Sequence, residues 1–274
     1  NRNKSDNKDF SFHHEGGFDC ITEPTLKILH LLEKKNISAT FFIVSDILDR
    51  YPTLSKRLKE SRHEIGCHSS SHDVPKVNEN AKNIEEWKKD IYYAKSKISN
   101  FFEKKIIGYR APSAYLYDWM LDILINNEFN YDTSVSNNFI FNKTNLKNSN
   151  ISGAPYIIKS ATDKDLVELP FNTLPFLGLN FPSSGAFFYR ALGNKYAILS
   201  LNRSLALSHT SFYLHPLDFS NEKFITEKGV KKRLYWINKG EKLFKNFEYL
   251  LDQFNGKWTD CSSVYKDFYE KYSS

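Results

Sequence analysis

Two histidines, His68 and His72, are the residues of this chain whose types and spacing most clearly suit chemistry. They lie in the segment Ile65–Asp73, where three serines separate the two imidazoles. This spacing allows both rings to reach one point from a helical turn or a tight loop, which is a common way to hold a divalent metal. A carboxylate, Glu15, lies about fifty residues upstream in the segment His13–Gly17. Two imidazoles and one carboxylate leave a coordination position open for water, which is typical of a catalytic metal site.

The elements that position these residues can be predicted from the pattern of apolar residues. Short apolar runs predict strands, and longer runs with helical spacing predict helices. In the first half of the chain we expect strands at 10–12, 39–44, 63–67, 106–110 and 131–135, and helices at 24–35, 48–61, 84–102 and 117–127. His13 and His68 therefore come directly after predicted strands.

The alternation of strands and helices indicates the fold class. Such alternation, with polar residues gathered after the strand ends, is typical of an α/β barrel or a doubly wound sheet whose site lies at the carboxyl edge. In the second half we expect a loop over 137–165, strands at 167–171 and 211–215, and helices near 228–254 and 262–272. No internal repeat and no Pro-, Gly- or Ser-rich linker divides the chain, so we expect a single domain.

The composition indicates a globular protein rather than a disordered one. Of 274 residues, 41% are apolar and 15% aromatic, which is enough to bury a substantial core. The net charge of +6 comes from lysines spread along the chain, not from a basic cluster interleaved with aromatics. We therefore expect no nucleic-acid partner and a solvated basic surface that is compatible with an anionic substrate or surface.

The cysteines and the apolar runs bear on the compartment. Cys20, Cys67 and Cys261 are odd in number and widely spaced, which argues against a disulfide framework and fits a reducing compartment. We therefore expect a cytoplasmic location. Because the chain begins at Asn1 without an initiator Met, removal of an N-terminal signal stays open. No run approaches the ~18 apolar residues of a membrane span, so we expect no integral membrane segment. The sequence leaves the oligomeric state open.

Several segments in order along the chain resemble one known family. They are Phe10–Phe18, Ala39–Phe42, His63–His72, Gly108–Pro112, Gly153–Tyr156, Val167–Pro170, Ser184–Arg190 and Phe212–Pro216. This order resembles the polysaccharide deacetylase family, which is carbohydrate esterase family 4 with its NodB-homology domain, and in particular the branch with an Asp-Val-Glu type first motif. The resemblance extends from about Phe10 to about Phe219, and its most specific part is Ala39–Phe42 followed by His63–His72.

The resemblance implies a deformed (β/α) barrel of the polysaccharide deacetylase type in a single domain. On this basis we expect a polar extension at 1–9, a catalytic domain at 10–219 and a C-terminal helical segment at 220–274 packed on the same domain. The implied activity is metal-dependent hydrolysis that removes N-acetyl groups from a sugar of a polysaccharide or glycolipid. The implied cofactor is a divalent metal, with Zn²⁺ the first expectation, and the implied partner is an acetylated carbohydrate.

The resemblance also implies roles for individual residues. His68, His72 and Glu15 match metal ligands, and His215 matches the general acid. Arg110 matches the arginine that orients the catalytic base. Ser113 falls where the family uses a backbone N–H for the oxyanion. We further hypothesise that Glu168 orients His215.

One position departs from the family pattern: His13 stands where the family has the Asp that serves as general base. Three readings are open. His13 is itself the base, since an imidazole titrates near neutral pH. One of His13 and His14 joins the metal ligands. Alternatively, the base is lost, and the chain is a catalytically impaired carbohydrate-binding homologue.

Another hydrolase of a non-peptide C–N bond on the same scaffold is a further alternative. The sequence leaves open which sugar and linkage are recognised, whether the substrate is a polymer or lipid-linked, and which metal is bound.

Overall fold

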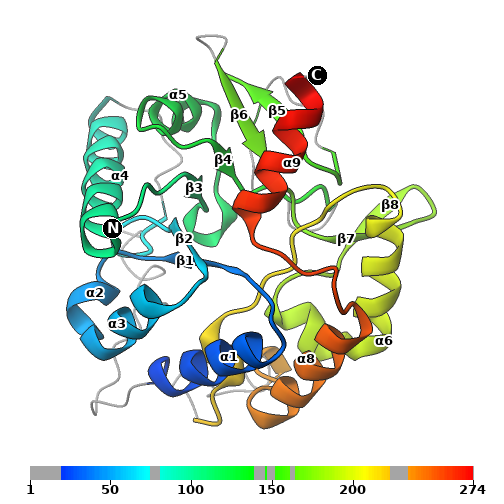
Figure 1. Cartoon of the computed structure of the whole chain (residues 1–274). Helices are drawn as coiled ribbons and strands as arrows, with labels where there is room; N and C mark the ends of the chain where they lie inside the picture. The colour runs from blue at the N-terminus through cyan, green and yellow to red at the C-terminus, as the bar shows by residue number, and fades with distance from the viewer. Residues whose placement is uncertain are drawn as a thin grey trace, which may run out of the picture.

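The computed structural model describes residues 20–74, 81–138, 146, 152–160, 164–222 and 234–273. The predicted strand at 10–12 and the segment that contains His13 and Glu15 lie outside the described residues. The described part is a mixed α/β fold, as the alternating pattern predicts (Figure 1).

The first half of the chain supplies four strands and most of the helices around them. The elements in order are α1 Thr22–Lys34, β1 Thr40–Ile43, α2 Ile47–Arg50, α3 Pro52–Glu60, β2 Glu64–Cys67, α4 Ala81–Phe102, β3 Gly108–Tyr109, the 3₁₀ turn η1 Pro112–Ala114, α5 Asp118–Asn126 and β4 Tyr131–Asp132.

The second half completes the sheet, adds a hairpin and closes with helices. Its elements are β5 Tyr156–Lys159, β6 Asp165–Glu168, β7 Thr173–Phe176, β8 Leu179–Pro182, α6 Ala186–Leu205, η2 Pro216–Phe219, α8 Glu241–Gln253 and α9 Cys261–Ser273. β7 and β8 form a separate two-stranded antiparallel hairpin.

The main sheet has the strand order β1-β2-β3-β4-β6-β5. Neighbouring strands are parallel from β1 to β6, and only β5 runs antiparallel, against β6. Helices connect the first parallel strands, as parallel pairing requires, because the chain must return to the same end of the sheet. All the carboxyl ends of the parallel strands therefore meet at one edge.

The sheet is curved rather than flat. In a flat sheet, β1 and β6 would be about 19 Å apart, because four strand spacings separate them. The guanidinium carbon of Arg110 nevertheless lies 4.8 Å from the ring centroid of Phe42 on β1 and 4.8 Å from that of Phe171, just after β6. The strand ends therefore curl around Arg110, as a deformed barrel requires.

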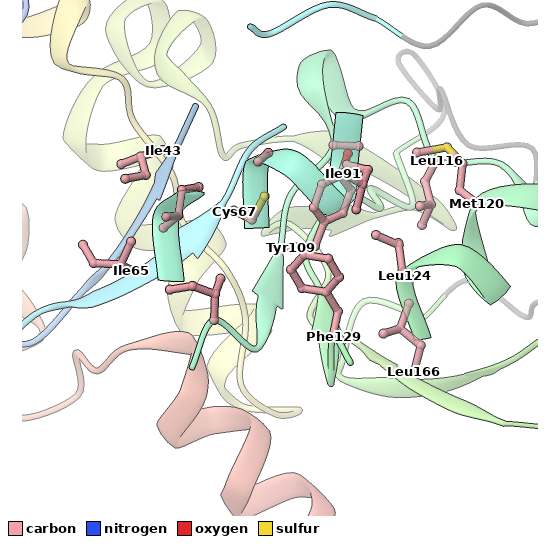
Figure 2. Close-up of a cluster of buried hydrophobic side chains, with 14 of the residues drawn as sticks. Ile43, Ile65, Cys67, Ile91, Tyr109, Leu116, Met120, Leu124, Phe129 and Leu166 are labelled. Carbon is pink, nitrogen blue, oxygen red and sulfur yellow. The ribbon is translucent and has the colours of Figure 1, made fainter. Parts of the chain in front are cut away.

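The largest hydrophobic cluster lies between the first strands and helices α4 and α5 (Figure 2). Helix α4 forms because its buried residues recur at helical spacing, at Trp87, Ile91, Ala94, Ile98 and Phe102. Figure 2 shows Ile91 of α4 and Leu124 of α5 near Tyr109 of β3. This packing fixes the strands whose ends carry the candidate site.

The C-terminal helices pack on two further clusters. Leu243 and Leu250 of α8 join Leu32 of α1 in one of them. Val264 and Phe268 of α9 pack against a small cluster formed by Tyr131 of β4, Val167 of β6 and Leu169 just after β6. Both helices therefore contact elements of the first half or of the main sheet.

Four expectations about elements need correction. The predicted helix 48–61 is two helices, α2 and α3, because Pro52 starts a new helix and Tyr51 takes non-helical dihedrals. The expected loop 137–165 contains strand β5. The expected strand 211–215 is reduced to a single bridge between Phe171 and Ser211.

The fourth correction concerns α6 and the β7–β8 hairpin, which the apolar pattern did not predict.

Two further expectations from the sequence concern disulfides and membrane-spanning helices. Cys67 and Cys261 are free thiols. Within the described ranges, no helix is both long and apolar enough to cross a bilayer.

Candidate active site

The last residues of four parallel strands lie side by side at the carboxyl edge of the sheet. Cys67 pairs with Tyr109, Tyr109 with Asp132, and Asp132 with Glu168. The residues that follow these strands therefore start from one level. His68 and Arg110 are the first residues beyond β2 and β3, so the fold places them next to each other.

The loop after β2 brings the two predicted metal ligands together. The ring centroids of His68 and His72 lie 4.9 Å apart, with the planes at 72°. The loop backbone continues to pair beyond the strand, since the His68 N–H donates to the Ile43 carbonyl at 2.8 Å. Ser69 and His72 have φ values of 65° and 66°, a left-handed conformation that persists only where the surroundings enforce it.

The tautomer of His68 follows from its hydrogen bond. Its Nδ1 lies 2.7 Å from the carbonyl oxygen of Arg110, and an oxygen of this kind can only accept, so Nδ1 carries the proton. The neutral ring then has its lone pair on Nε2, the atom that binds a metal when Nδ1 is anchored in this way.

Both imidazoles are held in the uncharged form. Desolvation, and then the nearby His72, lower the pKa of His68 to about 3. Desolvation likewise lowers the pKa of His72. A metal ligand must be unprotonated, so the environment of both rings suits ligation.

The His68–His72 loop is braced by a residue that the sequence did not indicate. Asp90 of α4 accepts hydrogen bonds from the hydroxyl and from the backbone N–H of Ser70, the latter at 3.3 Å. On the other side of the loop, the Ser69 hydroxyl lies 3.0 Å from the Tyr109 hydroxyl. These contacts fix the loop between α4 and β3.

Arg110 is held in place by polar and aromatic contacts. Its Nε donates to the Thr133 carbonyl at 3.0 Å, and its Nη2 donates to the Thr133 hydroxyl at 3.0 Å and to the Ser211 hydroxyl at 3.3 Å. The guanidinium also lies over the ring of Tyr213, in addition to Phe42 and Phe171. Phe42 can lie there because Gly66 has no Cβ, which would lie 2.4 Å from the ring.

The chain turns sharply after Arg110. Ser113 and Ala114 have φ values of 54° and 62°, so two consecutive residues with side chains take the left-handed conformation. The Ala111 N–H donates to the Ser134 hydroxyl at 2.8 Å, which ties the start of this turn to the end of β4. Ser113 therefore lies on a constrained turn directly beside the strand ends.

His215 approaches the same place from the second half of the chain. Its ring centroid lies 5.5 Å from that of Tyr213, and the guanidinium carbon of Arg110 lies 5.1 Å from the same Tyr213 ring. The side chain is 56% exposed, yet desolvation by the surrounding protein, followed by the Arg110 cation, lowers the pKa of His215 to about 4. The structure therefore brings His68, His72, Arg110 and His215 together.

Asp218, which the sequence analysis missed, is the residue that anchors His215. Its carboxylate accepts the His215 N–H at 2.9 Å and lies 3.5 Å from the His215 Nδ1. Asp218 is buried and forms an ion pair with the fully buried side chain of Arg190. Only the spacing of three residues between His215 and Asp218 hinted at this contact in the sequence.

The hypothesis that Glu168 orients His215 does not agree with the contacts of Glu168. This carboxyl is fully buried, accepts the Val135 N–H at 2.9 Å and interacts with its strand neighbour Asp132. Glu168 therefore belongs to the interior behind Arg110.

Glu15, His13 and His14 lie outside the described residues, so their positions are not part of this geometry. Within the described ranges, no group of three or more His, Cys, Asp or Glu side chains is arranged to hold a metal. The two imidazoles, with a fixed tautomer on His68 and pKa values lowered by desolvation, fit a metal as two of its ligands.

Two family models match this chain, one in its first half and one in its second half. Residues 17–131 match the model of the polysaccharide deacetylase family, and residues 142–266 match the model of a domain of unknown function, DUF3473. A peptidoglycan-N-acetylglucosamine deacetylase of Bacillus cereus is 41% identical over 58 residues, which are 21% of this chain and 21% of that protein. The chain thus matches about a fifth of the length of this curated relative.

Two solved structures resemble the fold over most of the chain. A Mycobacterium smegmatis protein assigned to the polysaccharide deacetylases has a TM-score of 0.62 at 16% identity, over 90% of this chain and 77% of its own. A family 4 carbohydrate esterase pseudoenzyme of Bacillus anthracis has a TM-score of 0.50 at 13% identity, over 89% of this chain and 61% of its own. At such identities these structures show the fold, and they confirm the expected deformed barrel in a single domain. The family-model match shows a polysaccharide deacetylase domain over residues 17–131 of this chain, and the fold agrees with it.

Proposed function

We propose that this chain is a metal-dependent hydrolase that removes N-acetyl groups from a sugar of a polysaccharide or glycolipid. The observation that carries this proposal is the convergence of His68, His72, Arg110 and His215 at the carboxyl edge of one curved sheet. The name of the B. cereus relative, a peptidoglycan-N-acetylglucosamine deacetylase, supports an amino-sugar substrate.

His68, His72 and Glu15 are the proposed ligands of a divalent cation, with Zn²⁺ the expected metal. The two imidazoles suit this role because desolvation keeps both rings neutral and the Arg110 carbonyl fixes the tautomer of His68. A cation held there supplies Lewis-acid activation of water and of the amide carbonyl.

The other residues act on the substrate or on one another. The backbone of the turn at Ser113 would donate a hydrogen bond to the negative charge that develops on the amide oxygen. Arg110, fixed by Thr133 and three aromatic rings, would orient a base supplied by the first motif, where His13 lies.

His215 is the proposed proton donor to the departing sugar amine. Because its pKa is about 4, this ring is uncharged at neutral pH in the free protein and must first receive the proton that the base removes from water. Its hydrogen-bonded anchor, Asp218, would hold the ring in place for that transfer.

The test of this function is acetate release from N-acetylated oligosaccharides, measured with zinc-loaded protein. We expect release from chitin or peptidoglycan fragments and its loss in His72→Ala, with His30→Ala on the exposed face of α1 as the matched control. Ring opening of a small cyclic amide without acetate release would instead assign the alternative C–N hydrolase activity.

A second candidate function, binding without efficient turnover, is favoured by the first motif. His13 replaces the family's base Asp, and the polysaccharide deacetylase match begins only at residue 17, after this motif. If zinc and sugar bind but no acetate appears, a His13→Asp variant separates the two cases. A gain of about 10²-fold or more would show that the base was lost at this position. No gain would place the defect elsewhere.

A further inference from the structure

The β7–β8 hairpin exposes an apolar tip that folding does not explain. Phe176 and Leu179 flank a two-residue turn, Leu177-Gly178, and Leu177 is 86% exposed. Leu177 and Gly178 have φ values of 49° and 77°, as in a type I′ turn. The first position of such a turn favours Asn, Asp or Gly, and leucine is disfavoured there. The chain therefore keeps an exposed apolar side chain at a position where a polar residue would fold more easily.

Helix α6 extends this apolar tip with basic residues. The exposed positions Lys195, Leu199 and Arg203 recur at intervals of four and share one face of the helix. Leu207, just beyond the helix, is 75% exposed. We call the residues Phe176, Leu177, Leu179, Lys195, Leu199, Arg203 and Leu207 the hairpin–α6 surface.

The two parts of this surface are joined directly. Arg203 donates a hydrogen bond to the Pro175 carbonyl at 2.7 Å, and its guanidinium lies 6.0 Å from the Phe176 ring centroid. The Ser204 hydroxyl donates to the Thr173 carbonyl at 3.0 Å. Figure 1 shows the hairpin beside α6 on the right of the molecule, with α4 on the opposite side. The leucines, the phenylalanine and the two cations therefore belong to one continuous face.

The charge of the surrounding segment is of one sign. From Leu169 to Leu217 the sequence contains no Asp or Glu, although acidic residues make up 32 of the 274 residues. Among the described ion pairs, neither Lys195 nor Arg203 pairs with a carboxylate. An exposed apolar tip beside unpaired cations is complementary to a surface that is apolar within and anionic outside.

We propose that the hairpin–α6 surface docks on an anionic phospholipid bilayer. The side chains of Phe176, Leu177 and Leu179 enter the boundary between headgroups and acyl chains. Lys195 and Arg203 contact the anionic headgroups. The contact is peripheral, with no part of the hairpin or of α6 crossing the bilayer, and it does not depend on the proposed hydrolase activity.

The test is co-sedimentation of the full chain with vesicles of phosphatidylglycerol and phosphatidylcholine, compared with vesicles of phosphatidylcholine alone. We expect binding to the anionic vesicles that weakens with added salt. Leu177→Asn should reduce binding at least tenfold, because it removes the inserted side chain. The same change suits the left-handed turn, so the variant should fold at least as well as the parent. Lys195→Gln should reduce binding about fivefold.

Tyr92→Asn is the matched control, because Tyr92 is an exposed side chain (67%) on α4, away from this surface. It should leave vesicle binding unchanged. Equal sedimentation with neutral and anionic vesicles, or full binding by Leu177→Asn, would overturn the proposal. A dimer in vesicle-free solution that Leu177→Asn dissociates would also overturn it, because the surface would then be a contact between two copies of the chain.

Discussion

Asp132 and Glu168 are register partners at the ends of β4 and β6, and both carboxyls are fully buried. Asp132 accepts hydrogen bonds from the Ser134 N–H and hydroxyl, both at 2.8 Å. Burial, and then the neighbouring carboxylate, raise the pKa of Glu168 well above its ordinary value. Glu168 is therefore the member of the pair that is protonated, and the Asp132 carboxylate accepts a hydrogen bond from it.

This pair predicts a pH-dependent stability. A carboxyl whose pKa is higher in the folded state than in the unfolded state destabilises the fold as the pH rises above the unfolded value, near 4.5. Glu168→Gln keeps a neutral hydrogen-bonding group and removes that effect. We expect the variant to gain about 1–3 kcal/mol in free energy of unfolding at pH 8 and nothing at pH 4.

Urea denaturation at the two pH values measures this difference. The control is Glu85→Gln on the exposed surface of α4, which should change the free energy of unfolding by less than about 0.5 kcal/mol. A loss of stability in Glu168→Gln at pH 8 would show that Glu168 is ionised in the folded protein.

The buried ion pair of Arg190 and Asp218 predicts strong coupling. Asp218→Ala leaves the guanidinium of Arg190 buried without its carboxylate, which should cost about 3–5 kcal/mol. Arg190→Met in the same chain should restore part of that stability, because no unpaired charge then remains. Thermal or urea denaturation of the single and double variants measures the coupling. Strictly additive losses would mean that the two side chains do not interact in solution.

The contact of Asp90 with Ser70 predicts an effect on metal affinity. Asp90→Ala releases the loop that carries His68 and His72, and we expect zinc affinity to fall about 10- to 100-fold. Ser71→Ala is the control in the same loop. The Ser71 hydroxyl donates a hydrogen bond to the exposed carboxylate of Asp73, at 2.8 Å, and not to Asp90. Zinc titration of both variants tests the difference, and an unchanged affinity in Asp90→Ala would exclude a bracing role.

The regular elements could be predicted where periodicity was clear. Helices α1, α4 and α5 have buried residues at helical spacing, and β1 and β2 are short apolar runs. The break at Pro52 had a sequence signal, the restricted residue before a proline, that the apolar spacing outweighed. The strand Tyr156–Lys159 was hidden by its Asn-, Lys- and Ser-rich surroundings. Helix α6 lacks a simple period, because Gly193 interrupts its helical dihedrals and Arg190 is buried within it.

Only the site residues that belong to sequence motifs could be predicted. His68, Arg110 and His215 each follow a strand end or bridge, so their meeting at one edge was foreseeable. The partners Asp90 and Arg190 were not, because each acts across a tertiary contact between distant segments. Glu168 was expected near His215, yet strand register places it against Asp132.

His68 and His72 are the proposed ligands of a divalent cation at the carboxyl edge of the sheet. Isothermal titration of the full chain with Zn²⁺ tests this proposal most directly, using His68→Ala and His72→Ala against His30→Ala. We predict one site per chain, weakened at least 100-fold by either loop substitution and unaffected by His30→Ala. Equal zinc affinity in all four proteins would show that His68 and His72 do not bind the metal.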